Sequence, residues 1–492
     1  MKLFTRLIWV VIVSCVIGPP AWAERDVKEA VIKIYTVYNR HDYYEPWQMR
    51  GQRRRSGSGS IISGKRILTN AHVVADQTFI QVRRAGEAKK YVAEVEIVAH
   101  EYDLAILRVD NDSFFSDVEP LKIGDLAEVR DRVVVYGFPE GGDKLSITEG
   151  VVSRVEHQIY THSNAYLLSC QIDAAINPGS SGGPVIKEDK IVGVAFQAGS
   201  GENIGYMVPA PVINHFLGDI KDGTYDGTPG LGISWQEMEN PDIRARFHMA
   251  ENATGVLVNK IYPDSPATGL LESGDVILSV GGKNVENDGT IEFRKGERTF
   301  FGYSVQRKYI NDTVEFEILR ENRIMNTEIR LSRPLNSWRL VPHEQYDIAP
   351  QYYILGGLVF ESLTVNFLKE WGGNWYNAAP RNLVNYYYHG EPTADRREIV
   401  VLVKVLADEI NAGYYDQIYS VISYVNGERI STMRDLVRAF EEHQGKYHII
   451  VDQAGYEIVL EKSKVDKNSQ RILENYKISS DRSKDLESWQ SS

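Results

Sequence analysis

The chain has 492 residues, enough for roughly three domains of about 150 residues each. Its hydrophobic fraction of 43% and charged fraction of 25% are ordinary for globular proteins, which excludes a chain that is disordered over most of its length. The net charge of -12 argues against nucleic acid as the main partner, because phosphate backbones are bound by basic faces.

Residues 1–23 have the organisation of an export signal. A positive start is followed by an apolar run too short to span a bilayer comfortably, and then by a small-residue cleavage pattern that ends at Ala23. We therefore expect export to the periplasm or another extracytoplasmic space. Lipidation at Cys15 and an uncleaved membrane anchor stay open as alternatives.

The two cysteines, Cys15 and Cys170, would leave Cys170 alone once the leader is removed, so no intramolecular disulfide is expected. The apolar surroundings of Cys170 indicate a small buried hydrophobe rather than a catalytic thiol. No cluster of cysteine and histidine has metal-ligand spacing, and no glycine-rich phosphate loop occurs. We expect neither a metal nor another cofactor.

From Val27 to about Ile220, short β-rich segments alternate with glycine and polar turns, which predicts a barrel or a sandwich. Apolar residues at helical spacing between Val212 and Ile220 predict a closing helix. The turn-rich segment 221–229 then marks a domain boundary.

Three segments of this strand region contain the residues that nucleophilic acyl transfer needs. His72 lies in TNAHVV, Asp103 opens the apolar segment DLAIL, and Ser181 lies in DAAINPGSSGGP. Alone, the histidine and the aspartate would be taken as structural residues. Together, in the order His, Asp, Ser, they predict a catalytic triad.

The glycine-rich loop around Ser181 carries the most specific signal. Glycines on both sides of the serines permit a tight turn that points a hydroxyl outward. The backbone N–H groups of Gly179 and Ser181 are candidates for an oxyanion hole. A flexible Gly/Ser turn would not need the strand patterns that flank this loop. We assign Ser181 rather than Ser180 as the nucleophile because Ser181 directly precedes Gly182; the reverse assignment stays open.

TNAHVV, DLAIL and GSSGGP, in this order, resemble the HtrA/Deg family of serine proteases. The resemblance implies a mainly β chain with a chymotrypsin-like double β-barrel followed by α+β PDZ domains. The family usually has Asn where this chain has Ser180. The segments EPWQ at 45–48 and PGLGI at 229–233, with the C-terminal part 471–483, are similar to the branch of plant organelles and bacteria that has a second, divergent PDZ-like domain.

A weak internal repeat agrees with two such domains. Residues 276–285 and 421–430 both place apolar residues on either side of a tight turn. An amphipathic helix is predicted from Met433 to Phe440. The predicted domains are a signal peptide (1–23), a chymotrypsin-like protease domain (24–222), a PDZ domain (223–335), a divergent PDZ-like domain (336–467) and a loosely packed C-terminal tail (468–492).

The resemblance implies an ATP-independent serine endopeptidase that cleaves unfolded or damaged proteins and can also act as a chaperone. A non-catalytic holdase or peptide-binding scaffold with the same domains is the alternative, against which the complete triad argues. The residue six positions before the nucleophile, Ala175, would lie at the base of the primary specificity pocket. Cleavage after small aliphatic residues is therefore expected, because the pocket holds no carboxylate for a cation; Asp173 is expected to face away.

The first PDZ domain is expected to receive peptide C-termini at Gly230, Leu231, Gly232 and Ile233. In the second domain Val359 stands where a glycine would be needed, so conventional binding is not expected there. The resemblance also implies a homo-oligomer built from trimers, with a single trimer and a hexamer as the alternatives. Five aromatic residues from Tyr35 to Trp47 offer surface for such an interface, or else pack under their own barrel.

Overall fold

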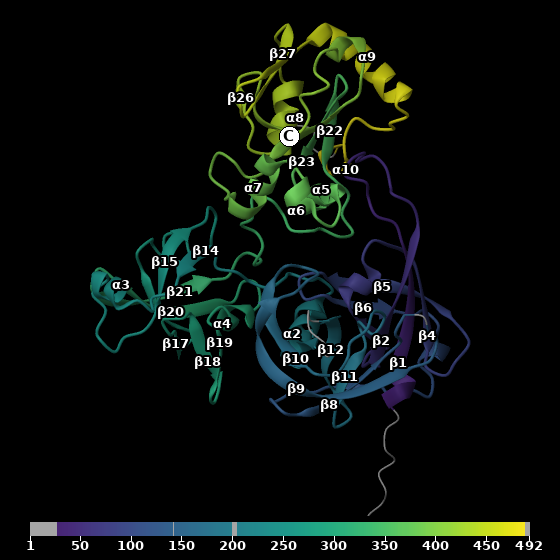
Figure 1. The fold of residues 1–492 in the computed structure, drawn as a ribbon, viewed down its shortest axis with the longest axis vertical. Helices are drawn as coiled ribbons and strands as arrows, with labels where there is room; N and C mark the ends of the chain where they lie inside the picture. The colour runs from purple at the N-terminus through teal and green to yellow at the C-terminus, as the bar shows by residue number, and fades with distance from the viewer. Residues whose placement is uncertain (1–26, 141, 199–203, 488–492) are drawn as a thin grey trace, which may run out of the picture.

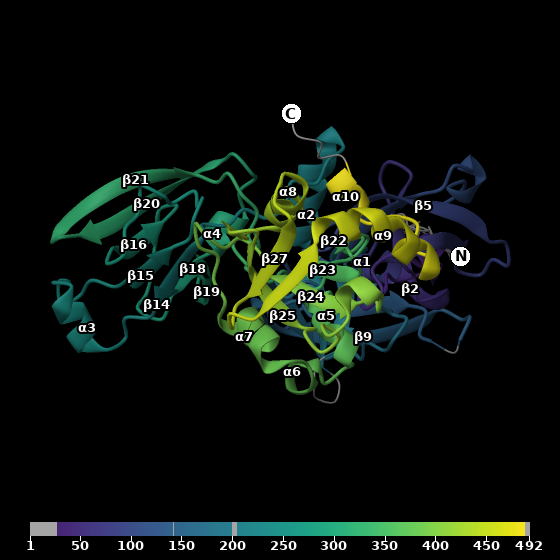
Figure 2. The ribbon, with the colours of Figure 1, turned by 90° about the horizontal axis from the view of Figure 1, so that it is seen from above.

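The computed structural model describes residues 27–140, 142–198 and 204–487. The predicted signal peptide, with Cys15 and Ala23, lies outside the described residues. Figure 1 shows a barrel domain and two smaller PDZ-like domains. Figure 2 looks down on the second PDZ-like domain, which lies in front of the barrel domain, with the first PDZ-like domain to one side.

The barrel domain consists of two closed barrels, which confirms the predicted double β-barrel. The first barrel closes in the order β1-β2-β3-β6-β5-β4, and the second in the order β11-β8-β9-β10-β13-β12, with β7 parallel to β12. The strands are β1 (Val31–Tyr38), β2 (Arg53–Ile62), β3 (Arg66–Thr69), β4 (Gln77–Arg84), β5 (Tyr91–Ala99), β6 (Leu104–Arg108), β7 (Lys122–Ile123), β8 (Arg132–Gly137), β9 (Ser146–Ile159), β10 (Tyr166–Ile172), β11 (Pro184–Lys187), β12 (Lys190–Ala198) and β13 (Gly205–Pro209).

Alternation of buried and more exposed residues explains these strands. In β8, Val133 and Val135 are buried and their neighbours are more exposed, as expected of a strand with one face in a barrel core. The predicted closing helix is α2 (Ala210–Asp219), which begins after Pro209 and buries Val212, Ile213 and Phe216. A single helical turn, α1 (Ala71–Val74), follows β3.

The first PDZ-like domain has a sheet in the order β14-β15-β16-β20-β21, with β17 paired to β16 and a separate hairpin of β18 and β19. Strand β14 is an edge strand, so one of its sides is unpaired within this sheet. The elements are β14 (Ile233–Gln236), α3 (Pro241–Arg246), β15 (Val256–Ile261), β16 (Val276–Val280), β17 (Lys283–Asn284), β18 (Thr290–Arg294), β19 (Glu297–Phe300), α4 (Tyr303–Gln306), β20 (Thr313–Arg320) and β21 (Arg323–Arg330).

The second PDZ-like domain has a sheet in the order β22-β23-β24-β25-β27-β28, with β26 paired to β25. The hairpins β16–β17 and β25–β26 occupy equivalent places, so the predicted repeat corresponds to two similar domains. The elements are β22 (Tyr352–Leu355), β23 (Leu358–Ser362), α5 (Val365–Leu368), α6 (Trp375–Ala378), α7 (Arg381–His389), β24 (Val400–Val405), β25 (Ser420–Val425), β26 (Glu428–Arg429), α8 (Met433–Glu441), β27 (Tyr447–Asp452), β28 (Glu457–Glu461), α9 (Lys462–Asn475) and α10 (Lys484–Glu487).

The predicted loose tail from 468 onward is wrong for the residues that the structure describes. Helix α9 buries Ile472 and Leu473 in the core of the second PDZ-like domain. The N–H of Ser483 then donates to the Tyr352 carbonyl at 3.0 Å, and Leu486 is buried. The prediction failed because it relied on the polar composition of this segment, whereas the few apolar residues of α9 lie on one face and are buried.

The loop between β1 and β2 reaches from the first barrel to the second PDZ-like domain (Figure 1). Tyr43 is 6% exposed within that domain's core, Tyr44 stacks on Phe367, and Trp47 meets Tyr352 edge to face. These rings pack within the chain, so they no longer support a subunit interface. No helix within the described ranges is long and apolar enough to cross a membrane.

Candidate active site

The pairing of β3 with β6 brings His72 and Asp103 together. The register places Thr69 opposite Ala105, so the residues just after β3 meet the residue just before β6. Asp103 Oδ2 lies 2.7 Å from His72 Nδ1, and Asp103 Oδ1 accepts the backbone N–H of His72 at 2.8 Å. The structure thus orients this imidazole with two contacts to one carboxylate.

Asp103 is held in a backbone conformation that few residues other than glycine adopt. Its φ is 53°, and the Asn70 side chain donates to its carbonyl oxygen at 2.7 Å. Asn70 was not singled out from the sequence, although it stands in the TNAHVV motif. Aspartate adopts this left-handed conformation more readily than most residues, and here the carboxylate lies beside His72.

The charge of Asp103 is kept despite burial. The residue is 1% exposed, and burial by itself raises the pKa of its carboxyl. The nearby His72 and His162 and the two hydrogen bonds from His72 outweigh burial, so the pKa of Asp103 lies below its usual value. An ionised Asp103 accepts the proton on Nδ1 and leaves Nε2 of a neutral His72 free to accept another.

The glycine-rich loop before β11 is anchored by Ser58 of β2. The Ser58 hydroxyl accepts the N–H of Phe138 and donates to the carbonyl of Gly179, both at 2.8 Å. The N–H of Ser58 donates to the Ser181 carbonyl at 2.8 Å. Sequence reasoning missed Ser58; the nearest signal was its place in the glycine-serine run of β2.

Close approach explains the glycines after the proposed nucleophile. A Cβ atom on Gly182 would lie 2.1 Å from the Ser58 carbonyl oxygen, and one on Gly183 would lie 2.0 Å from that of Tyr136. Gly179 has φ of 90°, a conformation that disfavours any side chain. The loop therefore packs against both barrels in a way that only glycine allows.

The two adjacent serines differ in surroundings. Ser180 is 6% exposed and its N–H donates to the Asn177 carbonyl at 2.9 Å, whereas Ser181 is only partly buried. Ser181 Oγ lies 3.4 Å from the Phe196 carbonyl oxygen and makes no hydrogen bond to His72. Such contacts are often loose before substrate binds. Among the described residues, the N–H groups of Gly179 and Ser181 have no hydrogen-bond partner.

The residues proposed for specificity lie at the end of β10. Ala175 is half-buried. Asp173 is exposed, and its carboxylate accepts the backbone N–H of Val151 at 2.5 Å. The Asp173 carboxylate is thus hydrogen-bonded to the backbone of strand β9.

The predicted peptide-binding residues Gly230, Leu231, Gly232 and Ile233 line one cavity of about 630 Å³. Phe300, Phe301 and Val305 of the first PDZ-like domain line it as well, as do residues of α7. Trp338 packs directly against Gly232, whose φ is 62°; a Cβ atom there would lie 2.5 Å from the indole.

In the described part of the chain, no three His, Cys, Asp or Glu residues gather where a metal ion could be held. Cys170 is fully buried, and burial raises the pKa of its thiol to about 12. A thiol in that state is a poor nucleophile.

Family models match most of the chain. The model of trypsin-like peptidase domains matches residues 57–194, and two models of PDZ domains match residues 229–331 and 341–485. Protease Do-like 4, mitochondrial, of Arabidopsis thaliana is 41% identical over 414 residues, which cover 84% of this chain and 76% of that protein. Protease Do-like 2, chloroplastic, of the same plant is 37% identical over 462 residues, with 93% and 75% covered.

A solved HtrA-type protease with a decapeptide superposes with a TM-score of 0.50 at 24% sequence identity. The match covers 62% of this chain and 95% of that one. At this identity the likeness concerns the fold alone.

Proposed function

This chain belongs to the Do-like, or HtrA, family of serine endopeptidases, and from that premise we propose that His72, Asp103 and Ser181 are its catalytic triad. The observation that carries the proposal is the His72–Asp103 pair of the first barrel, in which the Asp103 carboxylate contacts both the backbone N–H and Nδ1 of His72. The anchored glycine loop that bears Ser181 supports it further.

The mechanism follows from these roles. Ser181 Oγ attacks the peptide carbonyl carbon while His72 Nε2 takes its proton, and an acyl-enzyme forms as the leaving amine receives that proton from His72. Asp103 holds the imidazole in the required tautomer and stabilises the imidazolium. The N–H groups of Gly179 and Ser181 donate to the oxyanion. Water, activated by His72, then hydrolyses the ester and releases Ser181.

Substitution of the proposed nucleophile tests this assignment. Ser181→Ala should abolish cleavage of unfolded casein, a loss on the order of a million-fold for a triad nucleophile. The neighbouring Ser180→Ala variant is the matched control and should stay active. An active Ser181→Ala together with an inactive Ser180→Ala would move the nucleophile to Ser180.

The substrates we propose are unfolded or damaged polypeptides, cleaved without ATP, with a chaperone activity beside cleavage. We place Ala175 at the base of the primary pocket, so cleavage should follow small aliphatic residues. The cut sites in casein decide this point, and cuts mainly after Lys or Arg would contradict it. A holdase without catalysis is the second candidate. A fluorophosphonate probe separates the two, because a pure scaffold would not be labelled at Ser181.

We also propose export directed by residues 1–23 and assembly into trimers or hexamers. The relatives named above are mitochondrial or chloroplastic by name, which supports a compartment outside the cytosol. The mass of the mature N-terminal peptide from native cells tests export. A mature chain that begins at Met1 without a lipid would contradict cleavage after Ala23 and lipidation at Cys15.

A further inference from the structure

A second histidine stands beside the proposed catalytic pair. His162 lies in the loop between β9 and β10, and its ring centroid is 6.0 Å from that of His72. The ring of His100, from the loop that leads to Asp103, is 5.2 Å from His162 on another side. His162 contributes to the lowered pKa of Asp103, but no catalytic step assigned to the triad uses His162 or His100.

A hydrogen-bond chain fixes the orientation of these two rings. Asp347 Oδ2 lies 2.8 Å from His100 Nε2, and His100 Nδ1 lies 3.0 Å from His162 Nε2. Because a carboxylate accepts from Nε2, a neutral His100 presents a lone pair at Nδ1. His162 must then donate from its own Nε2, which determines its tautomer.

The last member of this series of hydrogen bonds, Asp347, lies in the segment that leads into the second PDZ-like domain. The Tyr346 ring stacks on His162 with centroids 4.0 Å apart, and its hydroxyl lies 3.1 Å from the His162 carbonyl oxygen. Asp347 is tied to the first barrel through Asp76, because each carboxylate accepts the backbone N–H of the other residue, at 2.6 and 2.9 Å. Residues 346 and 347 therefore support the His100–His162 pair from outside the barrel domain.

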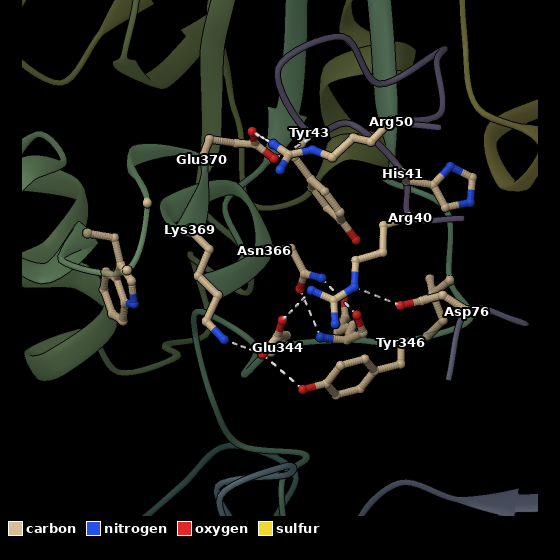
Figure 3. A pocket seen from close by; sticks show the side chains of 15 residues that line it. Arg40, His41, Tyr43, Arg50, Asp76, Glu344, Tyr346, Asn366, Lys369 and Glu370 are labelled. Atoms are coloured by element: carbon tan, nitrogen blue, oxygen red, sulfur yellow. Dashed lines mark hydrogen bonds and ion pairs between the residues drawn. The ribbon is translucent and has the colours of Figure 1, made fainter. Parts of the chain in front are cut away.

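Tyr346 also lines a charged cavity of about 410 Å³, shown in Figure 3, which His162 does not line. Arg40, Asp76 and Glu344 surround the tyrosine there, and Glu344 Oε2 lies 2.9 Å from its hydroxyl. The ring of Tyr346 is thus the part of the wall that meets the cavity and also covers His162.

The charges around His162 make its protonation state consequential. It faces His72, His100, Asp103, Glu344, Tyr346 and Asp347. Burial lowers the pKa of His162 to about 3, although the carboxylates of Asp103 and Glu344 favour the proton. When His162 is neutral, the negative charge of Asp103 interacts mainly with His72. A protonated His162 would compete for that carboxylate.

We propose that His162 is a positioning residue for the catalytic base, and that Tyr346 and Asp347 of the second PDZ-like domain keep it oriented, dry and neutral. The second PDZ-like domain is then a structural part of the catalytic centre. This inference rests on the proposed role of His72. If that role were wrong, His72→Ala would stay active, whereas failure of the present inference leaves His72→Ala inactive and the variants below normal.

The test is the pH profile of kcat/KM for a fluorogenic peptide, measured with the full chain. Tyr346→Ala should let water reach His162 and return its pKa toward the ordinary range. On the acid side of the profile, the loss of activity should then follow the binding of two protons rather than one. At the optimum pH, kcat should drop about tenfold with KM nearly unchanged. Tyr346→Phe, which keeps the ring, should retain a one-proton acid limb.

A second substitution separates positioning from simple loss of packing. In the double variant Tyr346→Ala/His162→Asn, the histidine that is proposed to take the second proton is absent, so the one-proton limb should return. Tyr456→Ala, which removes a 64% exposed tyrosine of the same domain, is the matched control and should leave both parameters unchanged.

A one-proton limb with normal kcat in Tyr346→Ala, or a two-proton limb that persists in the double variant, would overturn the proposal. If Tyr346→Ala does not fold by circular dichroism, Asp347→Asn serves instead. It removes the charge at His100 with little change of shape, and should lower kcat several-fold at constant KM. Unchanged kcat in folded Asp347→Asn would equally overturn the proposal.

Discussion

Ser58 shows how one buried hydroxyl can determine the geometry of a loop more than a hundred residues away in sequence. It is fully buried, and it satisfies an N–H of Phe138 and a carbonyl of Gly179 together. The same strand contains Ser60, whose hydroxyl is equally buried but has no hydrogen-bond partner. The two serines therefore form a natural comparison.

We expect Ser58→Ala to lower the free energy of unfolding by about 2 kcal/mol, because two buried backbone groups lose their partner. Proteolysis should fall at least tenfold as Gly179 loses its anchor. Urea unfolding and casein cleavage measure the two effects. Ser60→Ala removes an unsatisfied hydroxyl and should be neutral or stabilising. Equal effects of the two substitutions would show that Ser58 acts through packing alone.

The two PDZ-like domains differ in where their candidate peptide-binding segments lie in the sheet. Strand β14, which carries Ile233, is an edge strand with one side unpaired. Val359 of the second domain lies in β23, between β22 and β24, and is fully buried. The segment predicted to be a divergent carboxylate loop is thus a hairpin turn and a central strand, whose hydrogen bonds are already used.

We expect one carboxylate-dependent peptide site per chain. In the inactive Ser181→Ala background, calorimetry with a peptide of free C-terminus should give one site, and an amidated peptide should bind much more weakly. Gly232→Ala should weaken binding at least tenfold, because the new methyl group would meet Trp338. Two sites per chain that both need the carboxylate would contradict this contrast.

The contact between the second barrel and the first PDZ-like domain includes a buried histidine. Nδ1 of His157, in β9, lies 2.6 Å from Thr299 Oγ1, and Nε2 of the same ring lies 3.0 Å from Gln306 Oε1. Burial lowers the pKa of His157 to about 4, although the hydrogen bond to Gln306 favours the proton. The docked state thus holds fewer protons than the undocked state between pH 4 and the ordinary value of 6.5.

Docking of the first PDZ-like domain should therefore be strongest above pH 6.5 and weaken as the pH falls to about 4. The slope is at most about 1.4 kcal/mol per pH unit for one group. Hydrogen exchange of α4 at several pH values measures it. His157→Gln cannot take a proton, so its exchange should depend less on pH. An identical pH dependence in the variant would assign the effect to other groups.

At the scale of the whole molecule, the second PDZ-like domain connects the parts of the chain. It covers the aromatic residues of the β1–β2 loop and supplies Tyr346 and Asp347 beside His162. Arg397 also pairs with Asp264 of the first PDZ-like domain at 2.5 Å. A chain without this domain would lose contacts to both other domains.

We expect light scattering after size exclusion to give a mass that is a multiple of three chains for the full protein. Trimers should persist when the residues after Leu340 are deleted, while hexamers are lost. A strictly monomeric full chain with full activity at micromolar concentration would contradict assembly.

The same truncation should greatly reduce proteolysis, because it removes the support of His162 and exposes Tyr43, Tyr44 and Trp47. The fluorogenic peptide gives the rate, and thermal unfolding reports the stability of the remaining domains. A truncated protein with the activity of the full chain would contradict the structural role of the second PDZ-like domain.

Local patterns in the sequence were enough to predict the features that short stretches of residues encode. Short β-rich segments indicated a barrel or a sandwich, repeated hairpins indicated two similar domains, and the motifs around His72, Asp103 and Ser181 indicated acyl transfer. Each of these signals is local, because side-chain periodicity and turn chemistry act over a few residues.

The residues that surround the proposed site come from distant parts of the chain, and the folded arrangement was needed to identify them. Ser58 beneath the glycine loop, Tyr346 against His162 and the aromatic loop on the second PDZ-like domain all join segments far apart in the chain. The polar segment after residue 468 likewise became part of a core. Such contacts depend on the packing of whole domains against one another, and no local pattern of residues records that packing.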